Sequence, residues 1–212
     1  MLKDIQILLE KLKNDEIFKA FYLCGGTAIS YYLNHRMSYD LDFVGEEKLN
    51  ADLLKTLIIK YDAKFIPDPD ASVFRINTGE ELENYKMTFN IDNIKVEFFY
   101  PNDKVSEEIV LKYRSKSDNI LGNIKILPIE GIAALKILAL FKRHKIRGLF
   151  DVYVLLKENV IKTDKLEQYY SLEYKQKTIV EFIEDFEDDG TESLDFDENN
   201  TFFNKFNNLT HS

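Results

Sequence analysis

The chain has 212 residues and a hydrophobic content of 45%, which is enough for one large domain or two small ones with a buried core. It contains no run of about eighteen uncharged apolar residues, so a transmembrane span is excluded. The single cysteine, Cys24, excludes an internal disulfide and fits the reducing cytoplasm, and we interpret it as a small buried residue. The formal net charge of −9 comes from one segment near the C-terminus.

The N-terminal half of the sequence predicts helices interleaved with short strands. Apolar residues at helical spacing predict an amphipathic helix over about residues 2–13, and the charges within its apolar run argue against a signal peptide. A second long helix is expected at 51–61, and Asp92-Asn93 is a tight hairpin signal. Strands are expected at 20–24, 40–44, 64–66, 73–77, 85–91 and 95–100.

The pattern changes to helices after residue 101. Leu127-Pro128-Ile129-Glu130 is typical of a helix start, and this helix is expected to run through Phe141. Further helices are expected at 149–157, 163–171 and 173–187. Mixed strands followed by a run of helices predict an α+β fold. We expect one domain over residues 1–115 and a helical bundle domain over residues 116–212.

Two features near the N-terminus, a glycine-rich turn and a pair of aspartates, suit the binding of phosphate and of a divalent metal. Gly25 and Gly26 precede Thr27 and a short helix, and such a turn offers backbone N–H groups to phosphate. Asp40 and Asp42 alternate with apolar residues on the next strand, so both carboxylates face one side and can share a divalent metal. Each feature alone is typical of an ordinary turn or a solvated strand face. Together they predict a site for a metal-bound nucleoside triphosphate.

A third carboxylate lies on the strand expected at 95–100. Glu97 faces away from its apolar neighbours Val96 and Phe98. A carboxylate on a neighbouring strand could complete a metal site or take a proton from an attacking hydroxyl. The competing interpretation is that Glu97 pairs with Lys95 or another exposed charge.

The helix that begins near residue 129 carries Lys136 within an otherwise apolar run. A charge there is costly unless it reaches solvent or meets an anion. Arg143, Arg147 and Asp151 follow at offsets of seven, eleven and fifteen residues, which return to the face of Lys136 if the helix continues past Gly148. The alternative is an exposed stripe with an Arg147–Asp151 pair.

The segment 178–204 contains ten Asp and Glu residues and no Lys or Arg, so the rest of the chain is close to neutral. A near-neutral body gives no strong electrostatic footprint for nucleic acid. We expect the segment to be a solvated surface of the helical domain, remote from Asp40 and Asp42, and the alternative is a binding surface for a basic partner.

Over about residues 20–157 the chain resembles the AbiEii/AbiGii-type toxin nucleotidyltransferases of the polymerase-β-like nucleotidyltransferase superfamily. The resemblance is carried by Gly25-Gly26-Thr27-Ala28, His35-Arg36-X-Ser38-X-Asp40-Leu41-Asp42-Phe43, Val96-Glu97-Phe98 and Lys136-X-X-Ala139-X-X-X-Arg143-X-X-X-Arg147-X-X-X-Asp151-Val152-Tyr153. It implies a mixed-sheet nucleotidyltransferase domain followed by a helical domain. It also implies Mg²⁺-dependent transfer of a nucleoside monophosphate from a nucleoside triphosphate such as ATP. Members are toxins of bacterial toxin–antitoxin or abortive-infection systems, and some modify the acceptor end of tRNA, so tRNA and a cognate antitoxin are expected partners.

The resemblance also implies a role for each matching residue. Asp40 and Asp42 would bind Mg²⁺, and Glu97 would complete a second metal position or act as the base. Lys136, together with Arg143, would neutralise the pyrophosphate, with Asp151 orienting these cations rather than touching metal. The residues implied for triphosphate binding are Gly25, Gly26, Thr27, Arg36, Ser38, Lys136 and Arg143.

One residue departs from the family pattern, and several functions stay open. The family usually has an acidic residue where this chain has Gly148, which bears on activity or on acceptor positioning. A small molecule or a protein side chain could replace tRNA as the acceptor. A glycosyltransferase also uses an Asp-X-Asp pair, but it leaves the Gly-Gly-Thr motif unexplained. A non-catalytic member that binds nucleotide or a partner through the same pocket is the third alternative.

Overall fold

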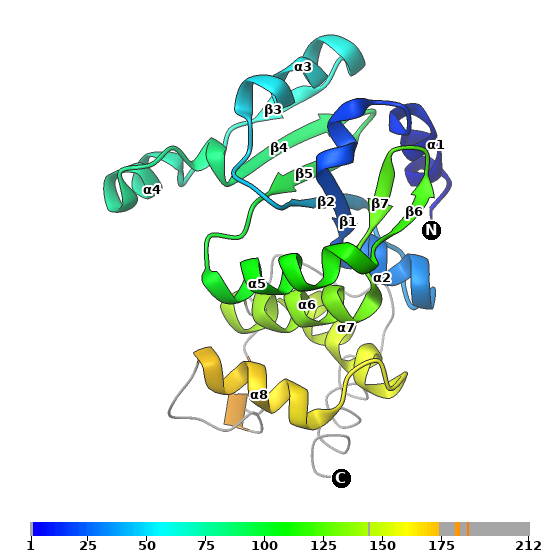
Figure 1. Ribbon diagram of the computed structural model, residues 1–212, viewed down its shortest axis with the longest axis vertical. Coiled ribbons are helices and arrows are strands. Elements are labelled where there is room, and N and C mark those ends of the chain that lie inside the picture. The colour runs from blue at the N-terminus through cyan, green and yellow to red at the C-terminus, as the bar shows by residue number, and fades with distance from the viewer. Residues whose placement is uncertain (1, 144, 174–180, 183–185, 187–212) are drawn as a thin grey trace. The chain divides into compact units, whose positions relative to one another are not determined.

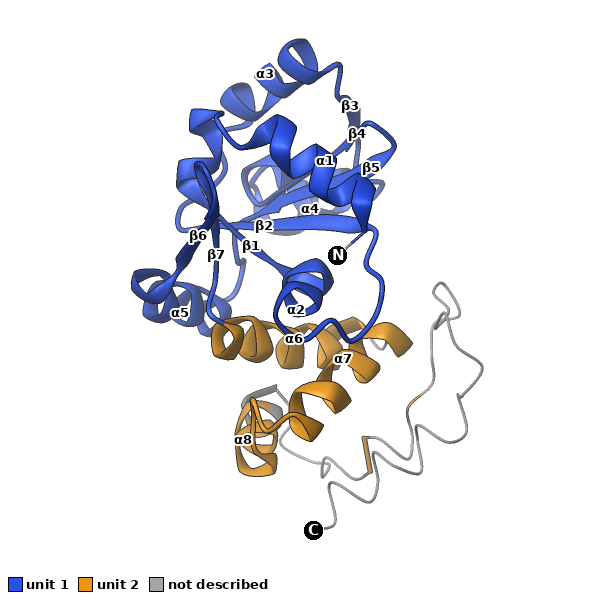
Figure 2. Cartoon of the chain, turned by 90° about the vertical axis from the view of Figure 1, so that its right-hand side faces the viewer, with its two compact units in different colours: residues 1–128 blue, residues 129–212 orange. Residues whose placement is uncertain are grey.

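A seven-stranded mixed sheet forms the centre of the N-terminal part of the chain. The structure is a computed structural model that describes residues 2–143, 145–173, 181–182 and 186. The chain divides into two compact units, Met1–Pro128 and Ile129–Ser212, which are coloured separately in Figure 2. Unit 1 holds the sheet and unit 2 is helical where it is described, so the predicted α+β fold is confirmed.

The sheet has the strand order β3-β4-β5-β2-β1-β7-β6 (Figure 1). Strands β2 and β5 run parallel, as do β1 and β7, whereas the remaining neighbours are antiparallel. The bounds are β1 Phe21–Cys24, β2 Asp40–Gly45, β3 Lys64–Ile66, β4 Lys86–Ile91, β5 Ile94–Phe99, β6 Asp118–Leu121 and β7 Ile124–Ile126. Two neighbouring strands from distant parts of the sequence, β2 and β5, therefore lie at the middle of the sheet.

Side-chain alternation divides the sheet into an apolar face and a polar face. On the apolar face the rings of Phe43 and Phe98 stack with centroids 5.4 Å apart, and Phe18 lies 5.0 Å from Phe43. All three rings are fully buried. The opposite face carries Asp40 and Asp42, because residues on either side of a buried strand position point the other way. The core thus fixes which side of the sheet presents the carboxylates.

Helices cover both faces of the sheet in unit 1. Helix α1 buries Ile5, Leu8, Leu9 and Leu12, as its predicted amphipathic pattern requires. In Figure 2, α1 and α2 lie on opposite sides of β1 and β2. The helices of unit 1 are α1 Lys3–Leu12, α2 Gly25–Leu33, α3 Ala51–Tyr61, α4 Ala71–Thr78 and α5 Lys104–Tyr113, with 3-10 turns η1 Glu16–Ala20, η2 Leu82–Asn84 and η3 Arg114–Lys116.

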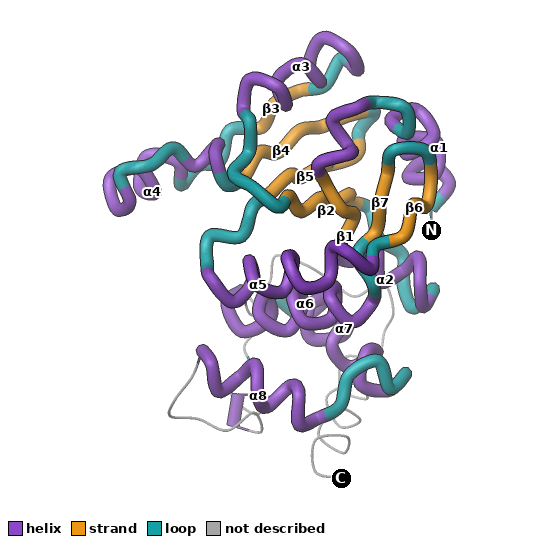
Figure 3. Tube along the Cα trace, in the orientation of Figure 1, coloured by secondary structure: helices purple, strands orange, loops and turns teal. Residues whose placement is uncertain are grey.

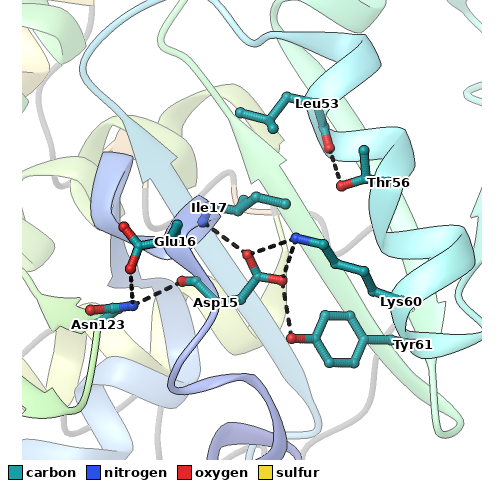
Figure 4. Close-up of polar contacts among 8 residues, drawn as sticks. All are labelled: Asp15, Glu16, Ile17, Leu53, Thr56, Lys60, Tyr61 and Asn123. Atoms are coloured by element: carbon teal, nitrogen blue, oxygen red, sulfur yellow. Dashed lines mark hydrogen bonds and ion pairs between the residues drawn. The ribbon is translucent and has the colours of Figure 1, made fainter.

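A buried carboxylate ties three separate segments of unit 1 together (Figure 4). Asp15 accepts hydrogen bonds from the backbone N–H of Ile17 at 3.0 Å and the hydroxyl of Tyr61 at 3.0 Å, and it pairs with Lys60 at 3.0 Å. Its backbone carbonyl accepts from the side chain of Asn123, which precedes β7. Asp15 therefore joins η1, α3 and the β6–β7 turn, and we interpret it as a structural residue.

Unit 2 contains α6 Ile129–Arg143, α7 Ile146–Lys157 and α8 Thr163–Glu173. Helices α6 and α7 pack on each other, and both contain buried apolar residues, among them Ile137 and Phe141 on α6 and Leu149 on α7. Because α6 ends at Arg143, the polar stripe that a continuous helix would have formed is broken ahead of Gly148. None of the described helices is long and apolar enough to cross a membrane.

The structure corrects the strand that we predicted at 73–77. These residues lie in helix α4, as Figure 3 shows, although Val73 and Ile76 are β-branched. The end of the helix explains the difference, since Gly79 adopts a left-handed conformation and its N–H bonds to the carbonyl of Arg75. None of the α4 residues is buried, so burial did not impose a strand there.

The structure also contains a β-hairpin after residue 101, where we predicted only helices. Strands β6 and β7 pair around Gly122 and Asn123, and β7 joins the sheet beside β1. The division between units consequently falls after Pro128, beyond the boundary that we expected at residue 115. Apart from Glu181, Phe182 and Phe186, the acidic segment 178–204 lies outside the described residues, as does most of the helix expected at 173–187.

Candidate active site

Asp40, Asp42 and Glu97 lie on one face of the sheet at the centre of unit 1. The parallel pairing of β2 and β5 places Asp42 directly beside Glu97 and Asp40 directly beside Lys95. Cross-strand partners face the same side, so these four side chains share the polar face. Both aspartates are half-buried and Glu97 is buried. The two sequence segments that carry the predicted site carboxylates, β2 and β5, are therefore adjacent in the fold.

The first residue of α2 touches the second of these aspartates. Gly25 has a φ of +69°, and a Cβ built at this position would lie 2.0 Å from Oδ2 of Asp42. A side chain at Gly25 would therefore clash with the carboxylate as well as strain the backbone. The sequence predicted a turn at Gly25 and Gly26, and the structure instead makes them the first turn of the helix itself. First-turn N–H groups lack helical acceptors, which suits them to bind an anion.

Side chains of α2 and the residue before it hold β2 in place. The hydroxyl of Thr27, 1% exposed, donates to the backbone carbonyl of Asp40, and the thiol of Cys24 donates to that of Asp42 at 3.4 Å. The Thr27 hydroxyl hydrogen is thus directed at the strand, which leaves its backbone N–H as the group suited to phosphate. The buried position of Cys24 agrees with its interpretation as a small core residue.

Arg36 and Ser38 approach the same helix start. A Cβ at Gly26 would lie 2.6 Å from Nη2 of Arg36 and 3.0 Å from Oγ of Ser38, so both side chains pack against this glycine. Ser30 fixes the loop between α2 and β2 by donating from its hydroxyl to the carbonyl of Arg36 at 2.8 Å. The guanidinium of Arg36 is therefore beside the first turn of α2, where it can add a positive charge to the N–H groups.

Glu97 lies beside two lysines, Lys95 and Lys86. Its Oε2 lies 3.3 Å from Nζ of Lys95 and 3.7 Å from Nζ of Lys86, and it accepts from the Thr88 hydroxyl at 3.4 Å. Lys86 is closer to Asp68, at 2.9 Å. The ion pair between Glu97 and Lys95 is the one that the competing interpretation of Glu97 expected.

The electrostatics of Lys95 show how strongly the acids act on it. Desolvation favours its neutral form, but the charges of Glu97, Asp42 and Asp40 outweigh this effect and raise the pKa of Lys95. Lys95 is therefore a permanent cation next to three acidic side chains. The sequence analysis named Lys95 only as an exposed partner of Glu97, although Lys95 lies two positions from Glu97 and shares its face.

The donor atoms fit Mg²⁺ when two carboxylates are counted rather than three. Within residues 2–143, 145–173, 181–182 and 186, no group of three His, Cys, Asp or Glu side chains is gathered closely enough to hold a metal. Mg²⁺ commonly takes one or two carboxylates together with substrate phosphates and water. Asp40 and Asp42 beside the N-terminus of α2 match that arrangement, whereas Glu97 is held by its lysines.

Unit 2 contains the remaining predicted site residues. Nζ of Lys136 on α6 lies 2.7 Å from Oδ2 of Asp151 on α7, and Asp151 is fully buried. The two residues meet across a helix pair rather than along one stripe. Arg143 is exposed at the end of α6. A Cβ at Gly148 would meet Leu140 at an ordinary 3.6 Å, so packing among the described residues of unit 2 does not require glycine there.

A family model described as the nucleotidyl transferase AbiEii toxin of a type IV toxin–antitoxin system matches residues 6–209. The chain belongs to the AbiEii nucleotidyl transferase toxin family. The predicted resemblance and the predicted activity class are thereby confirmed, and the protein is a nucleotidyltransferase. No curated protein matches this AbiEii family member.

Two solved structures from Helicobacter pylori share the fold of this AbiEii chain. JHP933 is 18% identical with a TM-score of 0.51, and the match covers 98% of this chain and 87% of that protein. A second H. pylori protein, described as a candidate nucleotidyltransferase, is also 18% identical with a TM-score of 0.58, covering 99% of this chain and 91% of that one. At this identity the likeness shows a shared fold.

Proposed function

We propose that this nucleotidyltransferase transfers a nucleoside monophosphate from an NTP to a hydroxyl of tRNA, in a Mg²⁺-dependent reaction, as the toxin of a toxin–antitoxin pair. The observation that carries the proposal is the position of Asp42, which lies against the first residue of α2 and two residues after Asp40 on the same face of β2. Metal-binding oxygens and phosphate-binding N–H groups thus adjoin each other.

Different residues of unit 1 bind the phosphates and the metal ion of the triphosphate. The backbone of Gly25, Gly26 and Thr27 binds its phosphates, with Arg36 supplying positive charge beside them. Ser38 packs on Gly26 and holds this region in shape. Mg²⁺ bound by Asp40 and Asp42 would neutralise charge on the phosphates and on the departing oxygen.

The reaction joins the acceptor oxygen to the α-phosphorus and breaks the bond from that phosphorus to the oxygen of pyrophosphate. Glu97 takes the proton of the acceptor hydroxyl, or it contributes to a second metal position. Lys136, oriented by Asp151, neutralises the leaving pyrophosphate together with Arg143. This last role is a prediction.

The binding proposal is tested by calorimetry with each NTP, with and without Mg²⁺. The double variant Asp40→Asn, Asp42→Asn should lose Mg²⁺-dependent binding while its thermal melting stays cooperative. Asp92→Asn is the control, because Asp92 is an exposed aspartate in the β4–β5 turn and the substitution also removes a negative charge. Equal affinity in the double variant and the wild type would reject the assignment of Asp40 and Asp42.

The acceptor is tested separately with NTP labelled at the α-phosphate. Label should appear on the tRNA fraction when the enzyme is mixed with bacterial tRNA, and Glu97→Gln should abolish the transfer. Label that appears on protein or on a small molecule instead would reject tRNA as the acceptor and leave the transfer reaction itself intact. The family also implies a cognate antitoxin. When this antitoxin is co-expressed with the enzyme, the transfer of label to tRNA should be abolished.

A further inference from the structure

Lys95 occupies a place within the carboxylate cluster that the proposed reaction does not use. It lies beside Asp40 in the parallel register of β2 and β5, and its Nζ reaches Oε2 of Glu97 at 3.3 Å. The charges of Glu97, Asp42 and Asp40 all act on its ammonium group. A cation at this position will repel any second cation that approaches the same carboxylates.

The burial of Glu97 explains why it needs a cation. The side chain of Glu97 is 8% exposed, whereas that of Lys95 is 45% exposed. A buried carboxylate without a partner is costly, so Glu97 retains a counter-charge in the absence of metal. Because Lys95 is half-exposed and has a long side chain, its ammonium group can withdraw toward solvent without leaving a buried charge of its own.

Lys86 does not have the same freedom. It lies 3.7 Å from Glu97 and 2.9 Å from Asp68, so its charge is shared with an acid outside the cluster. The three carboxylates and Lys95 sum to a formal charge of −2, which one divalent cation would neutralise. Removing the charge of Lys95 leaves −3 and a stronger attraction for metal.

We propose that Lys95 is a positioning residue that acts as the resident counter-ion of the metal-free site, so that a divalent cation that binds Asp40 and Asp42 must compete with its ammonium group for the negative charge of the carboxylates. This inference rests on the proposed metal site at Asp40 and Asp42. It makes Lys95 a determinant of metal affinity, through charge and without contact with the metal.

The test is a titration of the nucleotide-free protein with Mn²⁺, which takes the same oxygen ligands as Mg²⁺ and is detected through its enhancement of water proton relaxation. Lys95→Met should bind Mn²⁺ on the order of ten-fold more tightly than the wild type, as expected when a close opposing charge is removed from a half-exposed site. Lys95→Gln should behave in the same way, and Lys95→Arg, which keeps the charge, should match the wild type.

Lys11→Met is the matched control. Lys11 pairs with Asp92 at 2.7 Å and its side chain is 40% exposed, close to the value for Lys95, so the variant makes the same change in net charge outside the cluster. It should leave Mn²⁺ affinity unchanged. An equal gain in this control would show that net charge alone is responsible and would overturn the role of Lys95.

Two further outcomes separate the inference from the proposed function. If Asp40→Asn, Asp42→Asn abolishes Mn²⁺ binding but Lys95→Met binds no more tightly than the wild type, the inference is wrong and the metal site stands. If Mn²⁺ binding to the Lys95→Met protein survives the loss of both aspartates, the metal site is elsewhere and both ideas are overturned.

Discussion

Replacement of Gly25 by alanine tests how closely the phosphate-binding turn and the metal-binding strand are fitted together. At a φ of +69° alanine is strained by about 1–2 kcal/mol relative to glycine. Its Cβ would lie 2.0 Å from Oδ2 of Asp42 and 2.9 Å from Cβ of Asp42. Rotation of the Asp42 side chain relieves the first contact but not the second, so the backbone of β2 must also move.

The magnitude follows from adding these two effects. Overpacking of this kind typically costs about 1–3 kcal/mol, so Gly25→Ala should lower the free energy of unfolding by about 2–5 kcal/mol. The displaced carboxylate should also weaken Mn²⁺ binding. Urea unfolding and the Mn²⁺ titration measure the two effects on the same protein.

Gly79→Ala separates backbone strain from the clash. Gly79 has a φ of +74°, and a Cβ built there meets no atom of the described part of the chain within 4 Å. This variant should show the backbone cost alone, about 1–2 kcal/mol, with unchanged Mn²⁺ affinity. If Gly25→Ala is no less stable than Gly79→Ala and binds Mn²⁺ as the wild type does, the close fit between α2 and β2 is refuted.

Two further predictions concern buried carboxylates. Lys136→Met removes the ammonium group that pairs with the fully buried Asp151, so it should lower the free energy of unfolding by about 3 kcal/mol. Lys157→Met, at an exposed position, should change the free energy of unfolding by less than about 0.5 kcal/mol. Equal urea midpoints for the two variants would contradict a stabilising Lys136–Asp151 ion pair. For Asp15, burial raises the pKa, but bonds from Ile17, Lys60 and Tyr61 outweigh this and hold it below the ordinary 3.8. The stability that Asp15 contributes is therefore fully present above pH 3.8, the ordinary pKa of aspartate, and is lost as the pH falls through the lower pKa of the native state. Asp15→Asn should lower the free energy of unfolding by about 2 kcal/mol at neutral pH and by progressively less in acid. A difference that stays constant into strong acid, in urea unfolding over a pH series, would rule this out.

Local periodicity was sufficient to predict most of the polar face of the sheet. The alternation of apolar and polar residues predicted that Asp40 and Asp42 share one face of their strand and that Glu97 faces away from Val96 and Phe98. Both arrangements are present in the structure. Lys95 obeys the same alternation, but its importance depends on β2 lying next to β5 in parallel register, which is a long-range fact. The sequence therefore predicted Lys95 only as a candidate ion-pair partner of Glu97, and did not predict that it lies beside all three carboxylates.

The errors in the fold arose where the deciding interaction is distant or lies at the end of an element. The turn at Gly79 ends a helix at 71–78, and β-branched residues within it favoured a strand in our reading. The turn at Gly122 and Asn123 is a recognisable hairpin signal, but strands β6 and β7 are short and gain their stability from pairing with β1. The contact of Asp151 with Lys136 was expected from the family resemblance, but it forms across two packed helices and not along the single helix face that the residue spacing suggested.

The strand order has a consequence for how the protein is made. Strand β2 precedes its parallel partner β5 by about fifty residues of chain, and β1 cannot acquire its neighbour β7 until synthesis has passed Ile126. Long-range parallel pairing forms late, because the intervening chain must be ordered first. A ribosome-bound fragment that ends before β5 thus carries Asp40 and Asp42 without Glu97 or the sheet that aligns them. A cell that synthesises this nucleotidyltransferase therefore contains no assembled carboxylate site until β5 has been translated.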